Sequence, residues 1–280
     1  MKTLNLFHLS FIKVSLLALI LVFTIFSCKT RQKEDEQDSE EVTDISKLKE
    51  EIIEELTGYP LPTSFEVTKI LIEAGAPYIL SISNPVDNVD SYFTQKSRGL
   101  NLGVYGADLS YSSTYRMKQE TMLYLKAASQ LINELEITSA FNISFADRVE
   151  NNLDDQDSLI QIITSSFYDT YEYLNKNNQD KLSILVLAGS WIEGLYITTQ
   201  ITIVAEKSEK IVDLVARQKI SLNKLIEIME PVKDDQNISE LLNDLGNLKT
   251  IYGGVDEKLT EEQLNDITKT IEAIRNKIIE

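Results

Sequence analysis

The chain has 280 residues, of which 44 are Asp or Glu and 27 are Lys or Arg, so its formal net charge is −17. Because a phosphate backbone repels so acidic a chain, we do not expect the protein to bind nucleic acid. Hydrophobic residues make up 43% of the chain, which is enough for a hydrophobic core in one domain or two small ones.

The histidine and cysteine counts exclude several classes of catalytic site. The chain has one His and one Cys, His8 and Cys28. If the segment before Cys28 is removed and its thiol is acylated, as argued below, neither side chain remains available for chemistry. Serine–histidine–acid triads, cysteine nucleophiles and zinc sites built on His or Cys are then excluded, and so are disulfides. We expect no cofactor.

The first 27 residues have the pattern of a secretory signal peptide. Lysines flank a positive n-region, and an apolar run follows over residues 14–26. The run is short for a permanent membrane anchor, which needs about 20 apolar residues. Ordinary cleavage also requires small residues at the last and third-last positions, and Ser27 meets this requirement whereas Ile25 does not. The pattern favours a cut directly before Cys28.

The segment that ends at Cys28 resembles a bacterial lipoprotein signal, in which the new N-terminal cysteine carries acyl chains such as palmitate. The tripeptide Ile25-Phe26-Ser27 is a loose form of the usual box, of a kind common in lipoproteins of the Bacteroidota, and bulky Phe26 is its departure from the pattern. The resemblance implies that residues 1–27 are removed and that Cys28 anchors an outer-membrane lipoprotein. An uncleaved N-terminal anchor is the alternative.

Residues 28–44 predict a disordered acidic tether. They contain almost no apolar side chains after Cys28, so burial cannot offset the entropy of ordering them. Within the tether, residues 32–36 (QKEDE) resemble the short lysine-plus-acidic signal that exports some lipoproteins of the Bacteroidota to the outer face of the outer membrane. That resemblance implies exposure at the cell surface, and a solvated spacer is the alternative.

From residue 45 to residue 280 the apolar spacing predicts a single all-α domain. One helix is expected over 45–56, before Gly58-Tyr59-Pro60. A capping box of Thr63 and Glu66 should begin the next helix, and Pro85 should stand in the first turn of another. Further helices are expected over 115–135, 155–174 and 182–204. Another helix should end at Gly253-Gly254, and the last should begin after a cap formed by Thr260 and Gln263.

Only five prolines and few alternating stretches argue against a sheet protein, so we expect an irregular multi-helix bundle. The β-branched residues of 198–204 are assigned to the end of a helix. An α-solenoid of helical hairpins is the alternative architecture, and it ranks second because no side chains recur at a fixed period.

Residues 182–204 form the most apolar segment after the signal, and their length alone would span a membrane. Glu193 near the middle, with Tyr196 and Gln200 on the same face, instead favours a buried central helix that also buries Trp191. A carboxylate in such surroundings must be paired, hydrogen-bonded or protonated. We expect a partner for Glu193 such as a buried arginine, and a carboxylate that lines a ligand site is the alternative.

The glycines at positions 99, 103 and 106 recur at spacings of four and three in a predicted helix. Each costs roughly 1 kcal/mol relative to alanine, so another backbone or a ligand should lie close to them. Polar side chains recur on one face of this helix: Arg98, Asn101, Tyr105, Asp108 and Ser112. They indicate either tight helix packing with an Arg98–Asp108 or Asp108–Arg116 contact, or a binding site.

Residues 103–111, GVYGADLSY, resemble a stretch of uncharacterised helical lipoproteins of the Bacteroidota. The likeness covers about residues 95–140 and implies class and location only, because no activity is known for that family. Acidic clusters at 87–90 and 154–157 do not follow the calcium-loop pattern, so we expect no metal site.

The leading hypothesis is a lipid-anchored envelope protein that binds a small ligand or a partner protein without catalysing a reaction. Its ligand-binding residues would be Arg98, Asn101, Tyr105 and Asp108, in a cleft against Glu193 and Tyr196. The same residues could instead form a packed seam. The alternative function is a carboxylate enzyme, a lyase or glycan hydrolase, with Asp108 and Glu193 as acid and base.

Overall fold

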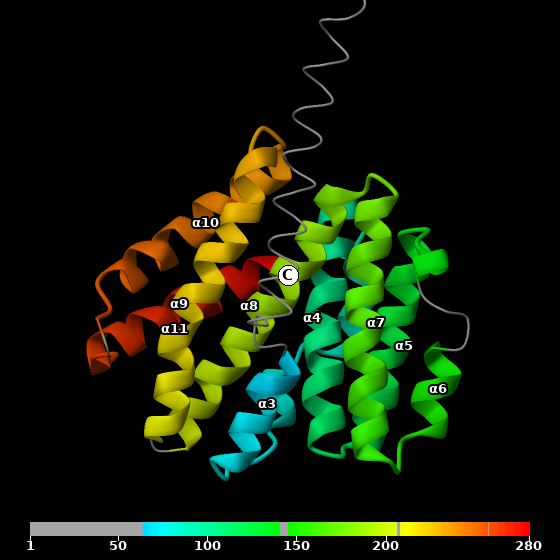
Figure 1. The fold of residues 1–280 in the computed structure, drawn as a ribbon, viewed down its shortest axis with the longest axis horizontal. Helices are drawn as coiled ribbons and strands as arrows, with labels where there is room; N and C mark the ends of the chain where they lie inside the picture. The colour runs from blue at the N-terminus through cyan, green and yellow to red at the C-terminus, as the bar shows by residue number, and fades with distance from the viewer. Residues whose placement is uncertain (1–63, 141–144, 206–207, 257) are drawn as a thin grey trace, which may run out of the picture. The chain divides into compact units, whose positions relative to one another are not determined.

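The computed structural model describes residues 64–140, 145–205, 208–256 and 258–280. Every regular element in these ranges is an α-helix or a 3-10 helix (Figure 1), so the prediction of an all-α, multi-helix fold is confirmed. The chain divides into two units, Met1–Gly58 and Tyr59–Glu280, and the described residues belong to the second. The predicted signal peptide, Cys28, the tether, the first predicted helix and the cap at Thr63 lie outside the described residues.

The α-helices follow one another as α3 (Ser64–Glu73), α4 (Gln95–Thr114), α5 (Lys118–Glu134), α6 (Phe145–Asn151), α7 (Gln156–Lys176), α8 (Asp180–Val204), α9 (Glu209–Met229), α10 (Gln236–Gly253) and α11 (Glu261–Ile279). Four 3-10 helices join them: η1 (Leu80–Ile82), η2 (Val86–Ser91), η3 (Thr138–Ala140) and η4 (Glu230–Val232).

Helix α8 is the centre of the described domain. It contacts α3, α4, α7, α9 and α11, with α4, α5 and α7 on one side of it and α9 and α10 on the other (Figure 1). By length and composition it could cross a membrane, but 94% of its most apolar stretch is buried among its neighbours. Trp191 is buried too. The predicted buried central helix over 182–204 is therefore confirmed.

The contacts of α8 and α11 distinguish this bundle from a solenoid. In a solenoid each repeat contacts only its neighbours. Here α8 contacts α4, and α11 contacts both α8 and α4, although long stretches of chain separate them. The core is therefore assembled from elements distant in sequence, and the solenoid alternative is wrong.

Helices α4 and α8 pack so closely that their backbones touch. A Cβ atom on Gly103 would lie 2.0 Å from the carbonyl oxygen of Val186, and one on Gly189 would lie 1.9 Å from that of Leu100. Only glycine allows this approach. Gly99 faces Leu182 and Leu185, one turn before the Gly103 contact on both helices, so α4 and α8 run parallel.

Several helix ends fall where the sequence predicts them. Thr260 and Gln263 form the capping box of α11, and α10 ends at Gly253. The helix predicted from residue 115 is wrong at its start, because α4 continues to Thr114 and α5 begins only at Lys118. Arg116, at a φ of 59°, makes the turn between them, ahead of the apolar face of α5.

Residues 76–91, which join α3 to α4, are called the strap below. The strap contains η1 and η2, and Pro85 precedes the short 3-10 helix η2 rather than opening an α-helix. Its backbone hydrogen-bonds to side chains of α4 and α11, which places it along both helices. This irregular segment therefore covers a part of the core that a helix would otherwise cover.

Replacement of Gly103 by alanine should destabilise the fold by about 1–3 kcal/mol or more, because the added methyl group would force the α4 and α8 backbones apart. Gly106, one turn further on α4, is the matched control, since a Cβ there would meet nothing within 4 Å. Gly106→Ala should stabilise the protein by about 0.4–1 kcal/mol. Urea unfolding of both variants measures the difference, and equal effects would contradict the proposed backbone contact.

Candidate functional site

A buried ion pair joins α8 to α11. Arg275 donates from Nε to Oε2 of Glu193 at 2.9 Å and from Nη2 to Oε1 at 3.0 Å. The two side chains are 7% and 0% exposed, respectively. The guanidinium also lies over the ring of Tyr196, 4.4 Å from its centroid. The predicted buried cationic partner of Glu193 is therefore confirmed.

The sequence analysis did not identify Arg275 as that partner. A signal was present, because Arg275 lies four residues after Ile271, within the apolar stripe that continues to Ile278. An arginine inside a buried stripe requires an acidic partner in the core. Only the packing of α11 against α8 shows which acid that is.

Asp108 belongs to the same buried region because of the parallel register of α4 and α8. It lies five residues after Gly103, and Glu193 lies four residues after Gly189, so both carboxylates follow the closest approach of the two helices. Asp108 is 0% exposed. Its Oδ2 accepts a hydrogen bond from the backbone N–H of Asn84 at 3.0 Å, whereas its Oδ1 has no hydrogen-bond partner among the described residues.

Burial raises the pKa of Asp108 well above its ordinary value, and the negative charge of Glu193 raises it further. Arg275 opposes this shift, as do the N–H of Asn84 and the hydroxyl of Ser83. Burial also raises the pKa of Glu193, against the charge and hydrogen bonds of Arg275. One guanidinium thus serves two buried carboxyl groups, and Asp108, which it does not contact directly, is the one that favours its protonated form.

Side chains of α4 and α11 hold the strap through its backbone. A buried segment without regular structure must find partners for its peptide groups. Three side chains donate to carbonyl oxygens of the strap: Arg275 Nη2 to Ile82 O at 3.0 Å, Tyr105 Oη to Pro85 O at 3.0 Å, and Tyr115 Oη to Ala76 O at 2.8 Å. In the opposite direction, Ile79 N of the strap donates to Tyr111 Oη at 2.8 Å. The tyrosines of α4 therefore replace the missing helix or sheet hydrogen bonds.

Two asparagines extend this network to the end of α11. Asn84 donates from Nδ2 to the hydroxyl of Tyr92 at 3.0 Å and to Oδ1 of Asn101 at 3.3 Å. Asn101 in turn donates to the carbonyl oxygen of Ile278 at 2.8 Å. Carbonyl groups in the last turn of a helix have no partner within the helix, so Asn101 satisfies one of them.

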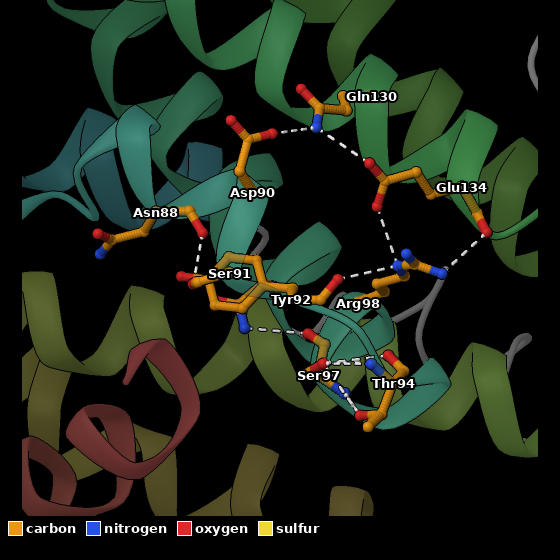
Figure 2. A network of polar contacts seen from close by, with 10 residues as sticks. Asn88, Asp90, Ser91, Tyr92, Thr94, Ser97, Arg98, Gln130 and Glu134 are labelled. Carbon is orange, nitrogen blue, oxygen red and sulfur yellow. Dashed lines mark hydrogen bonds and ion pairs between the residues drawn. The ribbon is translucent and has the colours of Figure 1, made fainter.

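Arg98 lies in a network that meets the previous one at Tyr92 (Figure 2). Its Nε is 2.9 Å from Oε2 of Glu134 and donates to the carbonyl oxygen of Tyr92 at 2.9 Å, and Gln130 links Glu134 to Asp90. Neither expected partner of Asp108 contacts it, because Arg98 is paired with Glu134 and Arg116 donates to Gln156. Of the predicted ligand-binding residues, the structure joins Asn101, Tyr105, Asp108, Glu193 and Tyr196 in one connected region, and Arg98 meets that region through Tyr92.

Buried side-chain atoms without hydrogen-bond partners occur on the strap and on α4. The described residues contain four such side-chain atoms: Tyr78 Oη, Ser83 Oγ, Asp108 Oδ1 and, in α7, Asn175 Nδ2. Ser83 is close enough to Asp108 and Tyr124 to lower the pKa of both groups, although Ser83 Oγ meets hydrogen-bond geometry with neither. We call Tyr78, Ser83, Asp108 and Tyr124 the Asp108 site.

The hydroxyl of Tyr78 interacts electrostatically with Asp108, although no hydrogen bond joins the two groups. Burial raises its pKa, and so do Tyr124, Glu120, Tyr111 and Asp108. Its ring packs 4.8 Å from that of Tyr111, between centroids. The sequence analysis missed Tyr78, Ser83 and Tyr124, because two of them lie on the irregular strap and one on α5, where no spacing relates them to Asp108.

Both candidate catalytic carboxylates are enclosed in the core. Glu193 has both oxygens held by Arg275, and both candidate catalytic carboxylates are fully buried. Within the described ranges no group of three or more His, Cys, Asp or Glu side chains could hold a metal ion. The free hydrogen-bonding capacity lies at the Asp108 site.

Comparison of the chain with protein-family models, with curated proteins and with solved structures finds no match.

Asp108→Asn should gain stability relative to the wild type as the pH rises. The folded protein holds the Asp108 proton more tightly than the unfolded chain, whose pKa is near 3.8. The stability that this proton contributes is complete below that value and is lost as the pH rises through the higher folded value. Asparagine can still accept a hydrogen bond from Asn84, but it does not ionise. The difference in unfolding free energy between Asp108→Asn and the wild type should therefore change by up to about 1.4 kcal/mol per pH unit between the unfolded and the folded pKa of Asp108.

Urea unfolding between about pH 5 and pH 9 measures this difference. Asp154→Asn is the matched control, because it makes the same change of charge at a side chain that is 92% exposed. A stability difference between Asp108→Asn and the wild type that stays constant over this range would contradict the assignment.

Proposed function

We propose that the protein is a lipid-anchored envelope protein whose helical domain binds a small polar ligand at the Asp108 site without catalysing a reaction. The single observation that carries the binding function is that Asp108 Oδ1 is buried without a hydrogen-bond partner at the contact between α4 and the strap, where Tyr78 Oη and Ser83 Oγ are also buried and unpartnered. The anchor rests on the sequence around Cys28. A partner protein of the envelope is the second candidate ligand, and it has no comparable site in the described residues.

The unpartnered atoms support binding because buried polar groups in folded proteins nearly always have hydrogen-bond partners. A buried donor or acceptor that lacks one costs about 1–3 kcal/mol. A small polar ligand between the strap and α4 would supply partners for these atoms. The fourth unpartnered atom, Asn175 Nδ2, lies on α7.

The strap provides a route for the ligand. Tyr78 and Ser83 lie on the strap, whereas Asp108 and Tyr124 lie on α4 and α5. Movement of the strap away from α4 would therefore separate the two halves of the site and admit a ligand between them. The hydrogen bonds from Tyr105, Tyr115 and Arg275 to strap carbonyl groups would close it again.

The contacts of Glu193 favour binding over the carboxylate enzyme. A general acid and a general base must both reach the reacting atoms of the substrate. Glu193 would first have to release Arg275, and breaking a buried ion pair costs about 3–5 kcal/mol. Asp108 alone keeps a free oxygen, which suits it to ligand recognition.

For the location, we propose the outer membrane, with the acyl chains of Cys28 as the membrane contact and the stretch 32–36 directing the protein to the cell surface. The net charge of −17 disfavours attraction to anionic lipid through the protein surface, so the acyl chains would supply the attachment.

Cys28→Ser should abolish incorporation of a fatty-acid analogue, since the chain has no other cysteine. The variant should either become soluble or remain attached through its unprocessed signal, and Ser27→Ala, which keeps a small residue before the cut, should be labelled normally. Metabolic labelling followed by gel analysis measures the incorporation of the fatty-acid analogue in each variant. Normal labelling of Cys28→Ser would contradict the lipid anchor.

A screen of small polar compounds should yield ligands that raise the melting temperature of the wild type and of Asp154→Asn but not of Asp108→Asn. A ligand at about 100 times its Kd should shift the melting temperature by roughly 5–10 °C in a domain of this size. Ser83→Ala should reduce the shift as well. The binding proposal fails if no compound acts on the wild type, or if every active compound acts equally on Asp108→Asn.

A further inference from the structure

We propose that α11 is the latch of the strap, so that residues 82–84 leave α4 only when α11 undocks from α8. The strap is held from two sides, by side chains of α4 and by groups in the last two turns of α11. The proposal concerns the coupled opening of two elements and requires no ligand. Only its consequence, that α11 controls access to the Asp108 site, rests on the proposed function.

Arg275 is the direct link between α11 and the strap. Its Nη2 carries two hydrogen atoms and donates both to Oε1 of Glu193 at 3.0 Å and to the carbonyl oxygen of Ile82 at 3.0 Å. Its Nε donates to the other carboxylate oxygen of Glu193 at 2.9 Å. A guanidinium is planar and rigid, so the two bonds to Glu193 fix its orientation and direct the remaining hydrogen of Nη2 at Ile82. The bond to the strap therefore depends on the pairing of α11 with α8.

Two relays of hydrogen bonds join the strap to the end of α11. Asn84 donates to Oδ1 of Asn101 at 3.3 Å, and Asn101 donates to the carbonyl oxygen of Ile278 at 2.8 Å. Asn84 also donates to the hydroxyl of Tyr92 at 3.0 Å, and that hydroxyl donates to the carbonyl oxygen of Ile279 at 3.3 Å. The carbonyl groups of a last helical turn have no partners within the helix. Undocking of α11 would therefore take an acceptor from both Asn101 and Tyr92.

Burial of these links makes their loss cooperative. Arg275 is 6% exposed, and Asn84 and Asn101 are 0% exposed. If the strap moved while α11 stayed docked, Arg275 would lose the acceptor of a buried N–H. If α11 moved while the strap stayed, the carbonyl oxygen of Ile82 would lose its donor. Each unpaired buried group is unfavourable, so the two elements should open as one unit.

The coupling should be confined to the middle of the strap. Near the start of the strap, Ile79 donates to the hydroxyl of Tyr111, and Tyr115 donates to the carbonyl oxygen of Ala76. Both bonds lead to the C-terminal end of α4 and not to α11. The backbone N–H of Asn84, which donates to Asp108 at 3.0 Å, lies between Ile82 and the relays. The amide of Asn84 should therefore follow α11, whereas that of Ile79 should not.

Backbone hydrogen exchange in the full processed chain, followed by NMR, tests the coupling. Ile267→Val removes one carbon from a 0% exposed side chain of α11, about two turns before Arg275. It should accelerate exchange in α11 by about 2- to 12-fold, the factor that loss of this contact implies. The amide of Asn84 should accelerate by the same factor. Ile211→Val is the matched control, because it makes the same change at a 0% exposed side chain of α9 and should leave Asn84 unchanged.

Arg275→Lys tests the guanidinium itself. The ammonium can still pair with Glu193, but it lacks the rigid fork that also reaches Ile82. Exchange at Asn84 should therefore accelerate more than exchange in α11. Lys277→Arg is the control on the same helix, because its side chain is 64% exposed and pairs with Asp244, and it should change neither rate. If Arg275→Lys does not fold, the comparison of the two Ile→Val variants still decides the coupling.

Three results would overturn the latch. Acceleration in α11 without acceleration at Asn84 would show that the strap opens by itself. Equal acceleration at Asn84 in Ile267→Val and Ile211→Val would show that the strap opens only when the whole domain unfolds. Unchanged exchange at Asn84 in Arg275→Lys would show that the guanidinium does not hold it. None of these results changes the melts of Asp108→Asn with added compounds, so failure of the latch is distinguishable from failure of the proposed function.

Discussion

The buried ion pair between Glu193 and Arg275 is the interaction on which the polar interior depends. Helix α8 is apolar on all sides around its middle, so Glu193 could not remain charged there without a partner. Arg275 supplies that partner with two hydrogen bonds and also binds the strap at Ile82. The pair thereby ties the central helix, the last helix and the strap together. Removing either side chain would leave an uncompensated charge in the core, at a cost of about 3–5 kcal/mol.

The glycine contact between α4 and α8 determines what else shares that arginine. Because Gly103 and Gly189 bring two parallel helices into backbone contact, Asp108 reaches the same buried region as Glu193. One guanidinium cannot neutralise two carboxylates, so Asp108 must hold a proton or accept another positive charge. The contact between α4 and α8 therefore has two effects. It packs the two helices closely, and it places Asp108 beside an arginine that is already paired with Glu193.

The strap explains why so many tyrosines and asparagines are buried in an all-helical protein. An α-helix satisfies its own peptide groups, but residues 76–91 form only short 3-10 turns and cannot do so. The hydroxyls of Tyr105, Tyr111 and Tyr115 supply partners for its backbone instead. Tyr78 and Ser83 lie on the strap with their hydroxyls unpartnered.

The sequence by itself determined the helical class, the burial of α8, the close contact at Gly103 and the need for a partner at Glu193, because periodicity, glycine spacing and the cost of a buried charge are local properties. It also predicted ligand-binding roles for Asn101, Tyr105, Asp108, Glu193 and Tyr196, which the structure joins in one buried polar region. The tertiary structure alone decided that the partner is Arg275, that Arg98 pairs with Glu134, and that the strap donates to Asp108 through Asn84. These contacts join residues of different helices and an irregular segment, and no sequence period encodes the register between such elements.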